Sequence, residues 1–203
     1  MEALKKPLAA LLGFEVDGYV LVDLDAFIEL VDLVDGVDFN VPQRMYYNDP
    51  TQNLYIDLYP GEQHLNGQKA MQLVRFRGYA AADIQRTKVQ QDFLRALAKK
   101  CLSVTTLTKI GGLADIFSKN VLTDLSVGNI AYFGQELLKC DFDQMYTHTL
   151  EGEGLWVNGT SVWALYLNKT LNAVNKYFNP YQAQITAGNV SFRTPDYLKS
   201  LMT

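Results

Sequence analysis

The side chains best suited by type and spacing to bind a ligand in this 203-residue sequence lie between residues 75 and 90. They are three arginines and a glutamine. Arg75 and Arg77 alternate with Val74 and Phe76, and in an extended backbone this alternation directs both guanidinium groups to one face. A guanidinium group is a planar fork of donors that matches two phosphate oxygens. The pair therefore predicts a binding site for an anion, with phosphate as the favoured group.

Arg86 and Gln90 belong to the next predicted element, an amphipathic helix over residues 84–100. At about 100° per residue they share one arc with Val89 and Phe93, so they lie on the side that faces the core. An arginine on that side needs a partner, because an unpaired buried charge costs several kcal/mol or more. The helix therefore adds a third arginine and an amide to the predicted site.

Two kinds of partner would satisfy these arginines: an internal carboxylate or a bound anion. Three arginines and an amide that converge from two neighbouring elements favour the anion. Asp83 precedes the helix at a position typical of an N-cap, and capping explains this aspartate without any function. The sequence thus predicts an anion pocket whose side chains are Arg75, Arg77, Arg86 and Gln90.

Composition narrows the nature of that anion. The chain has 48% hydrophobic residues, enough for a full core, and its length predicts one domain. A net charge of -4 and a sequence pI near 5.2 argue against a protein that binds nucleic acid through the electrostatic field of its net charge. A local basic cleft in an acidic chain suits a smaller anionic ligand.

The sequence has no apolar run of about 18 residues and no signal peptide at its start.

Other common kinds of functional site find no support. Cys101 and Cys140 do not form a Cys-x-x-Cys motif, and they are predicted to pack as small apolar residues near helix ends, with a disulfide as the less favoured alternative. His64 and His148 are isolated, and each is interpreted as a surface or hydrogen-bonded histidine. The nucleophile elbow, the P-loop and the dinucleotide-binding glycine motif are all missing.

Hydrophobic periodicity predicts strands that alternate with helices, which is typical of an α/β domain. In the first half the expected elements are helices at 4–12, 26–34 and 66–73 and strands at 19–24, 37–41 and 54–59. In the second half they are helices at 113–120, 127–139 and 168–177 and strands at 142–150 and 161–167. Ser126 and Asn168 are the expected caps of two of these helices, and 151–154 is expected to be a tight loop.

The apolar side of the predicted pocket is less well defined by the sequence. Phe93, Leu94 and Leu97 follow Gln90 along the helix and either line a groove or, as we favour, pack in the core. Another group precedes the strand at 54–59 and either lines the entrance or forms an ordinary turn closed by Asp49 and Pro50. The members of this group are Tyr46, Tyr47 and Asp49.

An ordered series of residues resembles the LytR-CpsA-Psr family of bacterial cell-wall enzymes. The series consists of Gly36 to Pro42, Gly61 to Gly67, Ala70, Val74 to Arg77, Asp83, Arg86 and Gln90. The resemblance covers residues 8–102 closely and continues more loosely to about residue 179. It implies an α/β fold in which helices flank a central mixed sheet, a family domain over residues 1–179 and a C-terminal tail over 180–203.

The resemblance also implies an activity. Family members are phosphotransferases that move anionic glycopolymers, such as teichoic acid or capsular polysaccharide, from a polyprenyl-pyrophosphate carrier onto peptidoglycan at the outer face of the bacterial membrane. Arg75, Arg77, Arg86 and Gln90 are then expected to hold the pyrophosphate. Asp83 matches the acidic position of the same motif and would orient an arginine or activate the acceptor hydroxyl. A magnesium ion is the implied cofactor.

This chain departs from the family pattern at its start. Members usually carry a membrane helix and then a strand region with metal-binding aspartates before the point where the chain begins, so we expect it to correspond to the C-terminal portion of the family domain. Val89 also stands where a second basic residue is common, and Asp35 replaces a glycine before Gly36. If central strands are missing, an exposed sheet edge favours a homodimer.

Three functions therefore compete. The first is transfer of glycopolymer to peptidoglycan. The second is binding of lipid pyrophosphate or polyanionic glycan without turnover, which the missing metal aspartates favour. The third is transcriptional regulation. Net charge -4 and the lack of a recognisable helix-turn-helix weigh against the third, so no nucleic acid partner is expected.

Overall fold

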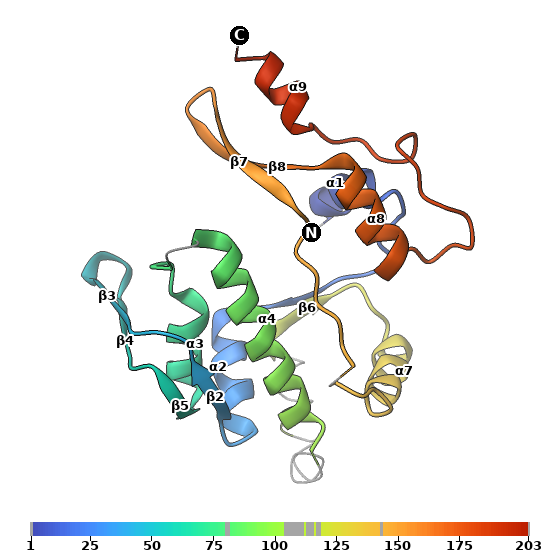
Figure 1. Ribbon diagram of the computed structural model, residues 1–203. Helices are drawn as coiled ribbons and strands as arrows, with labels where there is room; N and C mark the ends of the chain where they lie inside the picture. The colour runs from blue at the N-terminus through green and yellow to red at the C-terminus, as the bar shows by residue number, and fades with distance from the viewer. Residues whose placement is uncertain are drawn as a thin grey trace. The chain divides into compact units, whose positions relative to one another are not determined.

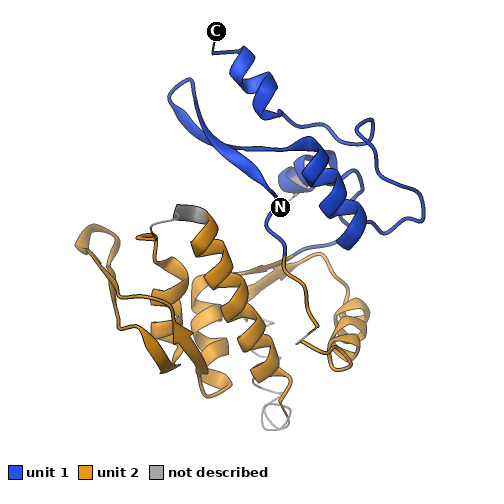
Figure 2. Cartoon of the chain, in the orientation of Figure 1, with its two compact units in different colours: residues 1–19, 148–203 blue, residues 20–147 orange. Residues whose placement is uncertain are grey.

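The computed structural model describes residues 2–79, 82–103, 112, 116, 119–142 and 144–202. The chain forms two compact units (Figure 2). Unit 1 contains residues 1–19 and 148–203, and unit 2 contains residues 20–147. Each unit has its own helices and strands, so the two are described separately.

Unit 2 alternates helices with short strands (Figure 1). Its helices are α2 (Leu24–Leu33), the 3-10 turn η1 (Pro50–Gln52), α3 (Gly67–Arg75), α4 (Ala82–Cys101) and α7 (Val127–Leu137). Its strands are β1 (Val20–Val22), β2 (Val37–Val41), β3 (Met45–Asp49), β4 (Leu54–Leu58), β5 (Gly61–Leu65) and β6 (Val121–Thr123). Unit 1 contains α1 (Glu2–Leu12), β7 (Gly152–Val157), β8 (Thr160–Leu165), α8 (Leu167–Tyr177) and α9 (Pro195–Ser200).

The described strands pair two by two. β1 pairs with β6, β2 with β5, β3 with β4 and β7 with β8, and every pair is antiparallel. The predicted α/β class is confirmed, but the described strands do not join into the expected central mixed sheet. The antiparallel pairing of β3 with β4 and of β7 with β8 follows from their connections, because short turns allow only antiparallel pairing.

The core of unit 2 forms where α4 crosses β2 and α3 packs against α2 and β4. Phe93 of α4 is fully buried and lies against the rings of Phe27 and Phe39, at centroid distances of 5.9 and 5.4 Å. Full burial of such a side chain contributes about 2–3 kcal/mol of hydrophobic stabilisation. This core fixes α3 and α4 side by side, and these two helices carry the arginines.

The start of α3 is held tightly against α2. The backbone N–H of Gly67 donates a hydrogen bond to the Asp32 carboxylate over 2.7 Å, and a Cβ at residue 67 would collide with the main chain at Ile28. The Asn66 side chain accepts from the backbone N–H of Lys69 and so caps the helix. These contacts set the direction in which α3 delivers its last residue, Arg75.

Most of the elements expected in the first half are present, with three differences. The strand expected at 19–24 is β1, but its residues are exposed rather than buried. β3 and β5 were not predicted, because Tyr46 and Tyr47 had been assigned to a loop and β5 is rich in polar residues. The sequence therefore underestimated the strand content of this half.

In the second half the helix capped by Ser126 is confirmed as α7. The residues expected to form a loop at 151–154 instead begin β7, and the described part of the predicted strand 142–150 is irregular. α8 begins at Leu167, so Asn168 lies inside it and does not cap it. α9 was not predicted, and the helix expected at 113–120 lies largely outside the described residues.

Candidate functional site

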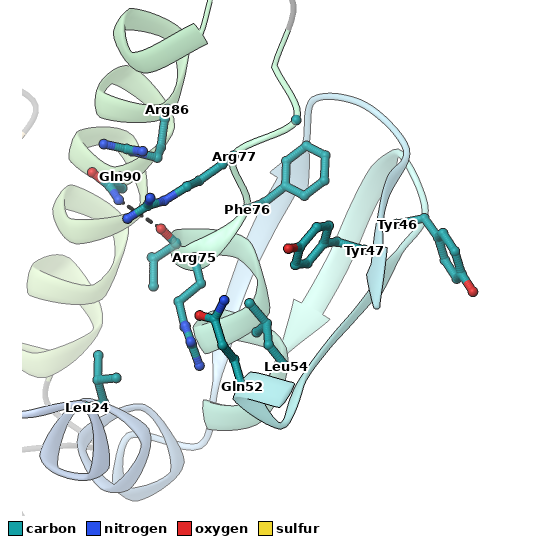
Figure 3. A pocket seen from close by; sticks show the side chains of 12 residues that line it. Leu24, Tyr46, Tyr47, Gln52, Leu54, Arg75, Phe76, Arg77, Arg86 and Gln90 are labelled. Atoms are coloured by element: carbon teal, nitrogen blue, oxygen red, sulfur yellow. Dashed lines mark hydrogen bonds between the residues drawn. The ribbon is translucent and has the colours of Figure 1, made fainter. Parts of the chain in front are cut away.

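A pocket of about 760 Å³ opens in unit 2 beside the ends of α3 and α4 (Figure 3). All four side chains predicted to bind an anion line it. The complete lining consists of Leu24, Tyr46, Tyr47, Gln52, Leu54, Val74, Arg75, Phe76, Arg77, Gly78, Arg86 and Gln90. The volume is within the usual range for small-molecule sites, about 300–1,000 Å³.

Arg75 and Arg77 reach the pocket by a route that the sequence did not predict. Arg75 is the last residue of α3, and Phe76 after it is extended, with φ of -64° and ψ of 133°. The predicted run of alternating extended residues over 74–77 is therefore wrong, because the helix continues two residues further than expected, to Arg75. Figure 3 shows Arg75 directed toward Gln52, whereas Arg77 is directed toward α4.

Neither guanidinium group has a hydrogen bond or ion pair with any described residue. Arg75 is half-buried and Arg77 is exposed, so water satisfies part of their hydrogen-bonding capacity. Two like charges on one short segment repel each other unless an anion lies between them. The internal carboxylate that the sequence left open as a partner is thus not found for these two arginines in the described part of the chain.

Arg86 and Gln90 lie one turn apart on α4 and face the same pocket (Figure 3). The Gln90 side-chain amide donates a hydrogen bond of 2.8 Å to the backbone carbonyl of Val74. That carbonyl belongs to the last turn of α3, where a helix leaves carbonyls without an internal donor. Gln90 therefore ties α4 to α3 through its amide nitrogen, and its carbonyl oxygen remains an acceptor in the pocket.

Asp83 was predicted as an N-cap. α4 begins at Ala82, so Asp83 lies in the first turn of the helix instead of before it. A carboxylate in the first turn is stabilised by the positive end of the helix dipole. The side chain itself lies outside the described residues, so its suggested roles stay predictions.

An apolar wall lies beside the arginines. Leu24, Leu54 and Val74 contribute aliphatic carbon, and Figure 3 shows Tyr47 turned toward Phe76. Leu24 and Leu54 were not predicted as pocket residues, since they come from α2 and β4 and only the fold brings them to the arginines. A long-range contact of this kind has no signal in a single sequence.

The predicted groove residues divide between core and surface. Phe93 and Leu97 are buried in the core, as favoured, and Leu94 is exposed. Tyr46 and Tyr47 do line the pocket, and Asp49 caps η1, which confirms its ordinary role. Hydrogen bonds to Thr51 hold the pKa of Asp49 below its usual value.

A fourth arginine, Arg44, lies near the pocket but is fully engaged. Its guanidinium donates to the carbonyls of Met45 and Leu58 over 3.0 and 2.8 Å and pairs with Asp57. The ring centroid of Tyr59 lies 4.1 Å from its Cζ atom. This hydrogen bond from Arg44, helped by the Tyr55 hydroxyl, lowers the pKa of Asp57. Arg44 is thus part of the β3–β4 hairpin's own structure.

Both cysteines are free thiols, so the less favoured disulfide is wrong. Cys101 packs against the core as expected, and burial raises the pKa of its thiol to about 11. Cys140 is exposed, which contradicts its predicted packing. The raised pKa makes the Cys101 thiol a poor nucleophile at neutral pH. Burial also raises the pKa of the Tyr79 hydroxyl, to about 12.

The described residues do not fit a magnesium ion. No group of three or more His, Cys, Asp or Glu side chains among them could hold a metal, and the pocket lining contains no carboxylate. Magnesium prefers oxygen ligands, usually with at least one carboxylate. Among the described lining residues, the arginines are the groups that can neutralise negative charge.

A model of the LytR_cpsA_psr family matches residues 1–178 of this chain. The polyisoprenyl-teichoic acid–peptidoglycan teichoic acid transferase TagV of Bacillus subtilis (strain 168) is 32% identical over 118 residues, which cover 57% of this chain and 30% of TagV. Biofilm regulatory protein A of Streptococcus mutans serotype c is 24% identical over 171 residues, which cover 82% of this chain and 42% of that protein. The chain thus spans less than half the length of these relatives.

Solved structures show the same fold. The crystal structure of B. subtilis TagV aligns with a TM-score of 0.70 at 24% identity, over 86% of this chain and 68% of TagV. A structure of TagT bound to LI-WTA aligns with a TM-score of 0.65 at 20% identity, over 85% of this chain and 63% of TagT. Within the described residues, no helix has the length and apolar character needed to cross a membrane.

Proposed function

This chain belongs to the LytR_cpsA_psr family, and we propose that its pocket binds the pyrophosphate of a polyprenyl-linked glycopolymer for transfer of the polymer to peptidoglycan. One observation carries the proposal: Arg75 and Arg77 enter a pocket of about 760 Å³ without partners among the described residues, beside an apolar wall. A lipid pyrophosphate has both matching parts, because it joins a multiply charged group to an apolar chain.

The chemistry follows from the side chains. The acceptor hydroxyl oxygen attacks the phosphorus that carries the glycopolymer, and the bond from this phosphorus to the bridging oxygen breaks. The electron pair leaves with that oxygen on polyprenyl phosphate, and the hydroxyl proton passes to a base. Guanidinium groups that hold the phosphate oxygens neutralise the charge on the leaving group and orient it, which accounts for much of the catalysis in phosphoryl transfer.

We infer Asp83 as the group that orients an arginine or accepts the hydroxyl proton. The start of α4 puts Asp83 one turn before Arg86, close in sequence to the proposed phosphate site. A base must lie within about 2.6–3.2 Å of the proton it accepts in the bound state. Asp83→Asn should therefore abolish transfer while leaving pyrophosphate binding nearly unchanged.

A second candidate function is binding of the same ligand without turnover. The lining of the pocket supports it, because the described lining residues include no carboxylate to act as base or metal ligand. Transcriptional regulation has no such support in the pocket, and the acidic net charge of -4 argues against it.

The two functions are separated by measuring binding and transfer on the same protein. Wild type and the Arg75→Ala/Arg77→Ala variant are incubated with a lipid-linked glycopolymer and isolated peptidoglycan, with and without magnesium. The matched control, Lys88→Ala/Arg95→Ala, also removes two positive charges from unit 2, but outside the pocket lining. Transfer by wild type and control but not by the pocket variant supports the enzyme. Binding without transfer supports the second function, and equal binding by all three proteins contradicts both.

The location and assembly of the protein follow from this proposal. We infer the outer face of the bacterial membrane, because the carrier is a membrane lipid and the acceptor is cell-wall material. A homodimer through a strand edge remains a prediction, supported by the exposed side chains of β1. Sedimentation velocity tests it: a dimer is expected, and a monomer at all concentrations would contradict it.

A further inference from the structure

The β7–β8 hairpin of unit 1 carries both tryptophans of the sequence on one exposed face (Figure 1 shows the hairpin). Trp156 pairs with Ser161, and Trp163 pairs with Gly154, so all four side-chain positions lie on the same side of the ribbon. Trp156 is 69% exposed and Trp163 is 47% exposed. Exposed tryptophans side by side on a strand pair are costly to leave in water and mark an interaction surface.

The opposite face of the hairpin already has a partner. Leu155, Val157 and Val162 are half-buried there, and α9 packs on this part of unit 1 through Leu198. Trp156 is therefore not needed to hold the hairpin on its unit, and Trp163 also lines a hollow beside α9 together with Phe192 and Leu198. Their face, formed by Gly154, Trp156, Ser161 and Trp163, is called the tryptophan face below.

The geometry of the tryptophan face is prearranged. The Trp163 indole N–H donates a hydrogen bond of 3.3 Å to the Leu150 carbonyl, and the ring lies over Gly152, where a Cβ would come within 2.8 Å of Nε1. Gly154 leaves open space beside the ring, since a Cβ there would meet nothing within 4 Å. A fixed, open aromatic ring binds a flat partner with little loss of conformational entropy.

The chemistry of the face selects its occupant. Its four residues are uncharged, Lys169 and Lys199 are each paired with a glutamate, and Arg193 lines a hollow next to Trp163. An uncharged face with one arginine at its edge attracts a polyanion or an anionic lipid surface far less than a cluster of cations would. The Ser161 hydroxyl has no hydrogen-bond partner among the described residues, so it is available to a ligand with hydroxyl groups.

The area of the face excludes a stable contact with a second copy by itself. Two tryptophans with these exposures present roughly 300 Å² of surface. A stable protein interface buries about 800 Å² on each partner. The face instead matches one or two sugar rings, whose axial C–H groups stack on an indole while their hydroxyls reach Ser161.

We propose that the tryptophan face binds a neutral glycan strand of pyranose rings and so holds the acceptor glycan. This inference rests on the proposed transfer to peptidoglycan, and it assigns the acceptor to side chains distinct from the arginine pocket. Trp156 and Trp163 supply the stacking surfaces, and Ser161 supplies a hydrogen bond. Stacking of bases on aromatic side chains sets the expected scale, about tenfold in affinity for one ring.

The experiment uses intrinsic tryptophan fluorescence, because these two residues are the only tryptophans and every change in emission reports on the face. The full chain is titrated with chitohexaose, a neutral β-linked oligosaccharide, and with soluble peptidoglycan glycan strands. A shift of the emission to shorter wavelength with a saturable binding curve is expected. Trp156→Ala should weaken binding about tenfold, with Trp163 as the remaining reporter.

Two variants serve as controls. Trp156→Phe keeps a ring and should lose less than about threefold in affinity. Tyr197→Ala removes another exposed aromatic side chain, from α9, and should bind as wild type. An unchanged emission with both glycans, or equal binding by wild type and Trp156→Ala, would overturn the proposal. The same holds if phosphatidylcholine vesicles alone shift the emission, or if Trp156→Ala abolishes self-association, because the occupant is then a lipid surface or a second copy.

The inference and the proposed function fail separately. Farnesyl pyrophosphate binding is measured on the same wild-type protein. Glycan binding without pyrophosphate binding contradicts the proposed function alone. Pyrophosphate binding without glycan binding contradicts the tryptophan face alone.

Discussion

Two groups of arginines in unit 2 differ in their surroundings: Arg44 alone is the first group, and Arg75 with Arg77 is the second. Arg44 donates to two backbone carbonyls, pairs with Asp57 and lies on the ring of Tyr59. Arg75 and Arg77 have none of these partners among the described residues, although both line the pocket. Protein structure satisfies the first group, and the second is left to water or a ligand. Residue type alone therefore does not mark a binding arginine; the lack of a partner does.

The largest effect should come from removing both unpartnered arginines. Arg75→Ala/Arg77→Ala is expected to weaken farnesyl pyrophosphate binding by about 100-fold, because each charged hydrogen-bonding group contributes about 1.5–3 kcal/mol. The melting temperature should not fall, since no contact among described residues is lost. Isothermal titration and thermal denaturation measure the two quantities. A large loss of stability would mean that these arginines are structural.

Removing Arg44 should give the reverse pattern. Arg44→Ala leaves Asp57 and two backbone carbonyls without their donor, so the melting temperature is expected to fall by about 2–5 °C. Farnesyl pyrophosphate binding should change less than about threefold. The Arg44→Lys variant is the control, because it keeps the charge and loses the fork of donors. A binding loss as large as that of the pocket variant would erase the difference between the two groups.

The pair of Arg44 and Asp57 also predicts a pH dependence. The pKa of Asp57 lies below its ordinary value of 3.8. The hydrogen bond from Arg44 is the largest cause, and the hydrogen bond from Tyr55 is the next. A carboxyl group whose pKa is lower in the folded state stabilises the fold above its unfolded pKa and loses this effect as pH falls through the folded-state pKa. The difference in melting temperature between wild type and Asp57→Asn should be present at neutral pH and shrink below pH 3.8. A difference that grows on acidification would contradict the pairing.

Gln90 stands between the two groups, since it is both engaged and part of the pocket. Gln90→Ala removes the hydrogen bond to Val74 that joins α4 to α3, and roughly 2–10-fold weaker ligand binding is expected. Gln90→Glu is a sharper test, because a carboxylate cannot donate to that carbonyl and adds negative charge beside the phosphate. It should bind the ligand more weakly than Gln90→Ala, and titration calorimetry compares the two directly.

Local sequence patterns predicted much of the molecule. The period of α4 placed Arg86 and Gln90 on one face, and both line the pocket; the strand expected at 54–59 is β4, which ends one residue earlier. The pairing of strands and the apolar wall of the pocket were beyond the sequence, because Leu24 and Leu54 meet the arginines only through long-range packing. Arg75 lines the pocket, but it is the last residue of a helix and not part of the extended segment that the sequence predicted.

Comparison of farnesyl pyrophosphate with farnesol tests the arginine pocket most directly, because the two molecules differ only in the anion. Titration calorimetry of the wild-type chain should show about 100-fold tighter binding of the pyrophosphate, and Arg75→Ala/Arg77→Ala should remove that preference. Equal affinity of the wild-type chain for both molecules would contradict a pyrophosphate site.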